Sequence, residues 1–314
     1  MIILDASDLK PFGGQLRPAV EHIAISPNGR LLALSGPSRP FELWNLQAAE
    51  RWPPYADVHY CAGPVAFHPT KPVCFPPNLY ALLAINTETR RMTESKDAVS
   101  DPAFAPDGEA FVSRNNVNGG VELRCYRWRA RGPLKRNWSR LLKRFARGLP
   151  TEWAVSLRVS PTGDTLAILE GTYLRGRSRF THLRAWRMRD GEPLAVVEVP
   201  PGTHESVAFS ADGAHIVTRA AARVVIRKAR TLEIVREVKL GRASPAAVAF
   251  HPDGRHFAAL VGPAVHLYDA STWAHAKTFE WGVGKLRCIA FSPDGALAAA
   301  GSDKGQVVVW DVDL

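Results

Sequence analysis

Residues 288–314 read CIAFSPDGALAAAGSDKGQVVVWDVDL and contain three apolar runs separated by two turns. The first run, Ile289–Phe291, is followed by Ser-Pro-Asp-Gly at 292–295, and the last, Val307–Trp310, follows Ser-Asp-Lys-Gly at 302–305. Proline presets the backbone at a central turn position, and glycine accepts the positive φ that closes a turn. The stretch therefore predicts three short antiparallel strands joined by two hairpins.

The same cassette recurs along the whole chain at a regular spacing. Its seven copies are IAISPNG at 23–29, VAFHPTK at 65–71, AFAPDG at 103–108, LRVSPTG at 157–163, VAFSADG at 207–213, VAFHPDG at 248–254 and IAFSPDG at 289–295. Phe291 lies 19 positions before Trp310, and Tyr268 lies 23 positions before Phe291. The resulting period of about 41–42 residues lies in the range of four-stranded propeller blades. The 23-residue gap has room for a fourth, outer strand, which we expect at 196–199 and 234–240 in two of the units.

The unit resembles the WD repeat, whose signature ends in Trp-Asp, here Trp310-Asp311. The other units are degenerate, with Trp44-Asn45, Trp186-Arg187 and Tyr268-Asp269 in the equivalent place. The resemblance extends over nearly the whole chain. It implies an all-β fold, a single domain over residues 1–314 that forms one seven-bladed β-propeller of four-stranded antiparallel blades.

The two ends of the chain are expected to complete one blade together. The chain stops at Leu314, just after the third strand of blade seven, so that blade lacks an outer strand. Ile2, Ile3 and Leu4 precede the first strand of blade one and have no other assignment. We therefore expect the N-terminal strand to supply the missing strand and close the ring.

Composition and motifs argue against catalysis, cofactors and membrane spanning. The chain has no apolar run near 18 residues, and its N-terminus lacks the pattern of a signal peptide. The four cysteines, Cys61, Cys74, Cys125 and Cys288, show no CxxC spacing, which favours reduced thiols and a cytoplasmic location. No catalytic triad, phosphate loop or metal-ligand motif is present, so we expect neither an enzyme nor a metal or cofactor site. His68 and His251 occupy the serine position of the turn cassette, where a turn hydrogen bond accounts for them.

The spacing fails at two places, and insertions on a repeat scaffold often carry function. Val159 and Trp186 are 27 positions apart, with the excess between strands two and three of blade four. Tyr126 and Val159 are 33 positions apart, between blades three and four. This second insertion contains ten Lys or Arg between Arg124 and Arg147 and no acidic residue. The whole chain has 40 Lys+Arg and 30 Asp+Glu, so these ten account for the net charge of +10.

Apolar residues in this segment recur with a helical period. Trp138, Leu141, Leu142, Phe145 and Leu149 fall on one helical face, with cations in between. The pattern predicts one short basic amphipathic helix between blades three and four. A helix that follows the outer strand of blade three would lie beside the 175–179 loop of blade four, and a helix that precedes it would lie on the opposite face. An outer strand at 134–138 favours the first arrangement.

The resemblance implies a monomeric, non-catalytic scaffold for protein–protein interaction. The cations favour an acidic protein partner, because ten uncompensated charges repel one another and have no structural use. The alternative is nucleic-acid or anionic-membrane surface binding through the 124–147 basic segment. The candidate binding residues are Arg131, Lys135, Arg136, Arg140, Lys143, Arg144, Arg147, Arg175, Arg177 and Arg179.

Overall fold

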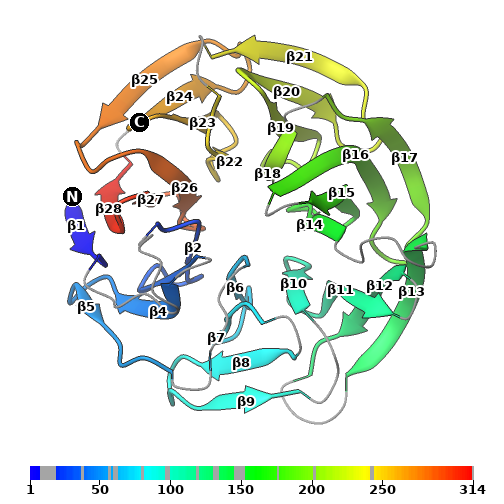
Figure 1. Cartoon of the computed structure of the whole chain (residues 1–314), viewed down its shortest axis with the longest axis horizontal. Coiled ribbons are helices and arrows are strands. Elements are labelled where there is room, and N and C mark those ends of the chain that lie inside the picture. The colour runs from blue at the N-terminus through cyan, green and yellow to red at the C-terminus, as the bar shows by residue number, and fades with distance from the viewer. Residues whose placement is uncertain are drawn as a thin grey trace. The chain divides into compact units, whose positions relative to one another are not determined.

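The structure is a computed structural model of the chain, and its described residues form seven four-stranded antiparallel sheets (Figure 1). It describes all residues except 8–18, 37–38, 56–57, 59–62, 79–80, 96–99, 118–119, 130–133, 145–152, 175–176, 201–202, 241–243 and 313–314. The backbone alone is described at 100, 116–117, 120, 143–144, 153–155, 172–174, 177–179 and 203–206. The predicted seven blades of four strands are confirmed.

The blades are divided between two compact units. The first unit comprises Met1–Leu79, Leu83–Glu94 and Pro245–Leu314, and contains blades one, two, six and seven. Its strands are β2 (His22–Ile25), β3 (Leu31–Gly36), β4 (Arg39–Asn45) and β5 (Glu50–Arg51) in blade one; β6 (Ala66–Phe67), β7 (Val73–Phe75), β8 (Leu83–Asn86) and β9 (Met92–Glu94) in blade two; β22 (Val248–Phe250), β23 (His256–Val261), β24 (Ala264–Asp269) and β25 (His275–Glu280) in blade six; and β26 (Leu286–Phe291), β27 (Leu297–Ser302), β28 (Gln306–Asp311) and β1 (Ile2–Asp5) in blade seven.

The second unit comprises Tyr80–Leu82 and Ser95–Ser244 and contains blades three, four and five. Its strands are β10 (Ser100–Phe104), β11 (Ala110–Val117), β12 (Gly120–Arg127) and β13 (Lys135–Arg144) in blade three; β14 (Trp153–Val159), β15 (Thr165–Leu174), β16 (Arg177–Arg187) and β17 (Pro193–Glu198) in blade four; and β18 (Thr203–Phe209), β19 (His215–Ala220), β20 (Arg223–Lys228) and β21 (Ile234–Lys239) in blade five.

A serine hydroxyl organises the turn between the first two strands of several blades. In blade seven, Ser292 Oγ donates to Asp294 Oδ1 at 2.5 Å and accepts from the backbone N–H of Leu297 at 2.9 Å. Gly295 closes the turn with a φ of 75°. Blade five repeats the arrangement at Ser210, whose Oγ donates to Asp212 Oδ1 at 2.5 Å. The cassette that defines the repeat therefore encodes one local hydrogen-bond pattern.

Histidine takes over this role in two blades, as the sequence predicts. His68 Nδ1 accepts from the backbone N–H groups of Thr70 and Lys71, at 3.2 and 3.1 Å. His251 Nδ1 lies 3.2 Å from the backbone N–H of Asp253, and its Nε2 lies 2.9 Å from the carbonyl oxygen of Gly295. The imidazole thus links the turn of blade six to the turn of blade seven.

The N-terminal strand completes blade seven, which confirms the prediction. Strand β1 pairs antiparallel with β28, from Ile2 opposite Val309 to Asp5 opposite Gln306. Leu4 is buried in a core cluster with residues of blades one and seven. Just after β1, the carbonyl oxygen of Ala6 accepts a hydrogen bond of 3.2 Å from Arg39 Nη2 of blade one. The strand is therefore held both by its partner strand and by the neighbouring blade.

The predicted amphipathic helix is wrong for residues 138–144. The described residues contain no helix, and this stretch is part of β13, the outer strand of blade three. Trp138 is 8% exposed but Leu141 is 46% exposed, so the two do not share a buried face as a helix would require. The unpaired edge of β12 offers backbone partners along eight positions, and long-range pairing of this kind overrides a local helical period. Phe145 and Leu149, which complete the predicted pattern, lie outside the described residues.

Strand β13 and the hairpin of strands β15 and β16 are longer than the repeat predicts. The outer strand expected at 134–138 is real but longer, since β13 continues to Arg144. The extra residues of blade four extend its hairpin, because β15 and β16 pair from Thr165 opposite Arg187 to Leu174 opposite Arg177. In the described part of the chain, no helix is long and apolar enough to cross a bilayer.

Candidate interaction site

Strand β13 is the outermost strand of blade three and the longest outer strand described (Figure 1). It has ten residues, whereas β17, β21 and β25 have six each. One edge pairs with β12, from Gly120 opposite Arg144 to Arg127 opposite Lys135. Among the described residues, no strand pairs with the other edge. Residues 135–144 of the basic segment thus lie at a sheet edge that no described strand pairs.

Trp138 anchors β13 to blade four. Its indole Nε1 donates to the carbonyl oxygen of Met188 at 2.8 Å, and its ring belongs to a core cluster that includes Leu166 and Trp186. Gly191 has a φ of 67°, and a Cβ added there would lie 2.7 Å from Trp138 Cε3. Glycine is therefore required at this turn both for its backbone conformation and for the close approach of the indole.

Arg140 reaches the same turn of blade four. Its guanidinium donates to the carbonyl oxygens of Gly191 at 3.2 Å and Asp190 at 2.9 Å, and to Glu192 Oε1 at 3.1 Å. The turn itself is ordered by Asp190, whose pKa is lowered to about 2, chiefly by the hydrogen bond from Arg187. With the carbonyl oxygen of Ser139, at 3.1 Å, this candidate binding residue already has four acceptors within the chain.

The side chain of Glu122 offsets part of the charge beside β13. Arg124 Nε donates to Glu122 Oε2 at 2.6 Å. Partial burial raises the pKa of Glu122, but hydrogen bonds from Arg124 and Ser139 and the nearby charge of Arg136 outweigh it, and the pKa is lowered. The charge of Arg124 is therefore neutralised by Glu122. Arg136 interacts with the same carboxylate electrostatically but forms no salt bridge with it in the described structure.

Four exposed cations lie at the end where β12 leads into β13, and we call them the basic cluster: Arg127, Arg129, Lys135 and Arg136. Arg127 and Lys135 share one face of the sheet, whereas Arg136, opposite Tyr126, is on the other face. Arg127 and Lys135 are directly opposite in the β12–β13 register. In the described part of the chain, no salt bridge reaches any of the four. Like charges directly opposite each other on neighbouring strands are destabilising, so the arrangement favours an external anion.

Comparison with known proteins identifies the last blade. Residues 275–311 match the profile of the family described as WD domain, G-beta repeat. This stretch is a WD40 repeat. It covers β25, the outer strand of blade six, together with β26, β27 and β28 of blade seven, so the WD40 repeat and the structural blade are offset by one strand. No match was found among curated proteins.

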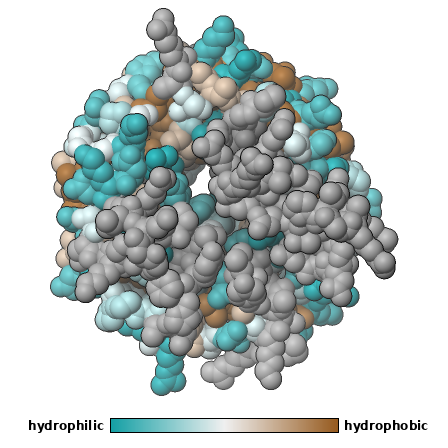
Figure 2. Space-filling view, viewed as in Figure 1, coloured by the Kyte–Doolittle hydropathy of each residue, from teal (hydrophilic) through white to brown (hydrophobic). Residues whose placement is uncertain are grey.

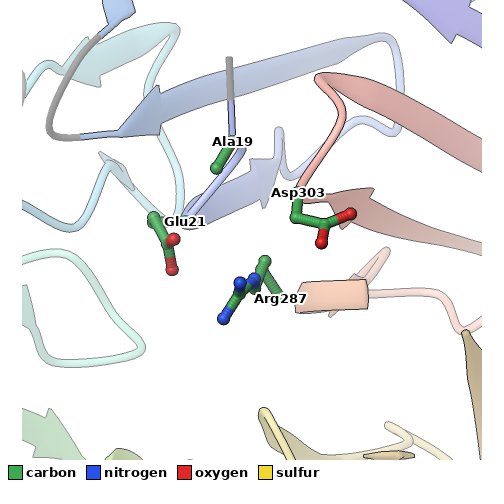
Figure 3. Close-up of a pocket in the computed structure, with 4 residues that line it drawn as sticks. All are labelled: Ala19, Glu21, Arg287 and Asp303. Carbon is green, nitrogen blue, oxygen red and sulfur yellow. The ribbon is translucent and has the colours of Figure 1, made fainter. Parts of the chain in front are cut away.

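A pocket lies beside the WD40 repeat in the first unit. It has a volume of about 340 Å³ and is lined by Ala19, Glu21, Arg287 and Asp303. Figure 3 shows the carboxylates of Glu21 and Asp303 and the guanidinium of Arg287 around the same open space. Asp303 Oδ1 accepts a hydrogen bond of 2.9 Å from the backbone N–H of Lys285, which holds its carboxylate in place. The sequence did not single out these residues, because they are scattered over blades one and seven.

The structure separates the predicted binding residues instead of bringing all of them together. Lys135 and Arg136 belong to the basic cluster, whereas Arg140 holds the turn of blade four. The backbones of Lys143, Arg144, Arg177 and Arg179 lie at the other end of their strands, next to the turns that join strands two and three. Arg131, Arg147 and Arg175 lie outside the described residues. Arg127 and Arg129 were counted in the basic segment but not selected, and only the β12–β13 register shows that Arg127 lies opposite Lys135.

The described residues contain no group of three His, Cys, Asp or Glu side chains that could hold a metal ion. The thiols of Cys125 and Cys288 are buried, and burial raises their pKa values to about 11 and about 12. Figure 2 shows a mostly hydrophilic described surface on one face, with small hydrophobic patches between the polar areas.

Proposed function

We propose that the chain is a non-catalytic scaffold that binds an acidic segment of a partner protein through the basic cluster and strand β13. WD40 domains generally mediate protein–protein interaction, and they are typically not catalytic. The observation that carries the proposal is the exposed pair of Arg127 and Lys135, opposite each other and without a salt bridge in the described structure. A carboxylate placed between them would turn a repulsive pair into two attractive contacts.

The rigidity of the supporting strand adds to this argument. Trp138 and Arg140 fix the middle of β13 against blade four, so the basic cluster is presented by an anchored strand. Cations that are already positioned lose less conformational freedom when a partner binds. The site is therefore already ordered before the partner binds.

Reversing the charge of exposed residues tests the proposal better than deleting the basic segment, for example residues 134–149. Deletion would remove the buried Trp138, and loss of binding would then follow from loss of structure. The test is the double variant Lys135→Glu/Arg136→Glu, which changes two side chains that are exposed in the parent protein. The matched control is Arg255→Glu/Lys285→Glu, which makes the same charge change at two exposed residues of the first unit.

The readout is fluorescence anisotropy with a labelled poly-glutamate peptide at about 150 mM salt. We expect the β13 variant to bind at least roughly tenfold more weakly than the control variant. Equal affinities for the two variants would refute the proposed site. The same titrations with a poly-thymidine oligonucleotide and with phosphatidylserine vesicles test the alternative partners. If the oligonucleotide or the vesicles bind more tightly than poly-glutamate, and charge reversal at β13 abolishes that binding, then the partner is a nucleic acid or an anionic membrane and not an acidic protein.

A further inference from the structure

We infer that the acidic partner segment binds in an extended conformation, by adding a strand to the free edge of β13. This inference rests on the proposed function and specifies how the partner is held. A strand at a sheet edge presents N–H and C=O groups that pair readily with another extended chain. In the described structure, β13 pairs with β12 on one edge only.

The length of β13 suits such a partner. Its ten residues pair with eight residues of β12, because the register shifts twice, and eight regular positions extend for roughly 26 Å at about 3.3 Å per residue. The outer strands of the neighbouring blades four and five have six residues each. Since alternate residues of an edge strand direct their backbone groups outward, β13 offers more pairing positions than either of them.

The charge of β13 selects which strand can be added. It contains Lys135, Arg136, Arg140, Lys143 and Arg144 and no acidic residue. Cations on an edge strand commonly oppose edge-to-edge aggregation, and here they would repel another copy of β13 or any basic strand. The cations other than Arg140, which is held by the turn of blade four, attract an extended segment rich in Asp and Glu, because cross-strand neighbours of opposite charge are favourable.

One apolar side chain adds a second requirement. Leu141 is 46% exposed on β13, whereas the nearby Trp138 is buried. A partner segment in which acidic and apolar residues alternate would place carboxylates near the cations and an apolar side chain near Leu141. The inferred ligand is therefore an extended acidic peptide with alternating apolar residues.

The experiment uses the intact protein and a fluorescein-labelled peptide of alternating Glu and Val, about ten residues long. A second peptide has the same sequence with N-methyl groups on its four central residues. It keeps every charge and side chain but loses backbone donors on both of its edges. A third peptide with Lys in place of Glu controls for charge. We expect the N-methylated peptide to bind at least about tenfold more weakly than its parent and the Lys peptide not to bind.

Hydrogen exchange locates the added strand. On binding the parent peptide, amides in residues 134–144 should become protected, whereas those of β17, an outer strand with a similar free edge, should not change. If both acidic peptides bind within about threefold of each other, or if β13 gains no protection, strand addition is wrong while the proposed acidic partner stands. If neither acidic peptide binds, the proposed function fails and this inference fails with it.

Discussion

The strand assignment of β13 makes a sharp prediction about two nearby residues. Trp138→Ala removes a buried indole that packs in the core shared by blades three and four and bonds to Met188. Truncation of a buried aromatic to alanine costs about 3–5 kcal/mol of the free energy of unfolding. Leu141→Ala, three positions away, removes a half-exposed side chain and should change the free energy of unfolding by no more than about 0.5 kcal/mol.

A third variant separates the hydrogen bond from the packing. Trp138→Phe keeps most of the apolar ring but leaves the carbonyl oxygen of Met188 without its indole donor. Loss of one partner from a buried hydrogen bond costs about 1–3 kcal/mol, so this variant should fall between the other two. The expected order of destabilisation is Trp138→Ala, then Trp138→Phe, then Leu141→Ala.

The assay is urea unfolding followed by far-UV circular dichroism and by tryptophan fluorescence. Midpoints are converted to free energies only where the two probes coincide and the slopes of the variants agree with the parent. A helix would place Trp138 and Leu141 on one buried face, so both alanine variants would then be costly. Similar costs for the two, or a cost below about 1 kcal/mol for Trp138→Ala, would refute the strand and its anchor.

Local geometry elsewhere in the chain supports three more predictions. Gly301→Ala should destabilise by about 1–3 kcal/mol in urea unfolding, because its Cβ would lie 2.6 Å from both Cβ and Cγ1 of the buried Val20; a loss below about 0.5 kcal/mol would contradict the clash. The pKa of Asp294 is lowered, chiefly by the hydrogen bond from the hydroxyl of Ser292, so the carboxylate stabilises the fold above about pH 4 and loses this contribution as the pH falls further. The difference in urea midpoint between the parent and Asp294→Asn should therefore shrink from pH 5 to pH 2, and a constant difference would contradict this prediction. Cys125 and Cys288 should react with a thiol reagent at pH 8 only after unfolding, since burial raises both pKa values to about 11 and about 12; fast reaction in the native protein would show that they are accessible.

Local chemistry explains which parts of the fold could be predicted. In most copies the turn cassette combines a glycine at positive φ with a serine or histidine that bonds within the same turn, so its recurrence identifies pairs of first and second strands. Blade two has Lys71 in place of the glycine, and blade three has Ala105 in place of the serine. The spacing between cassettes identifies the third strand and leaves room for the fourth. The N-terminal strand could be predicted because blade seven lacked a fourth strand while the apolar residues Ile2, Ile3 and Leu4 had no other assignment.

The binding residues were harder to predict because they depend on contacts between distant segments. Arg140 is one of ten cations between Arg124 and Arg147, but only its contacts with Asp190 and Glu192 distinguish it from Lys135. Arg127 and Lys135 are eight positions apart and become direct neighbours through the β12–β13 register. The pocket lined by Glu21, Arg287 and Asp303 joins residues from opposite ends of the chain, and no local pattern marks it.

The sequence by itself determined the repeat, the number of blades, the strand that completes the last blade and the confinement of the net charge to one segment. These properties depend on turn geometry, side-chain alternation and charge, which act over a few residues at a time. Tertiary structure alone decided that residues 135–144 form a strand, because their helical period competes with a long free edge of β12 and with the buried site of Trp138. It also decided which cations remain exposed, since compensation of charge depends on neighbours that are distant in the chain.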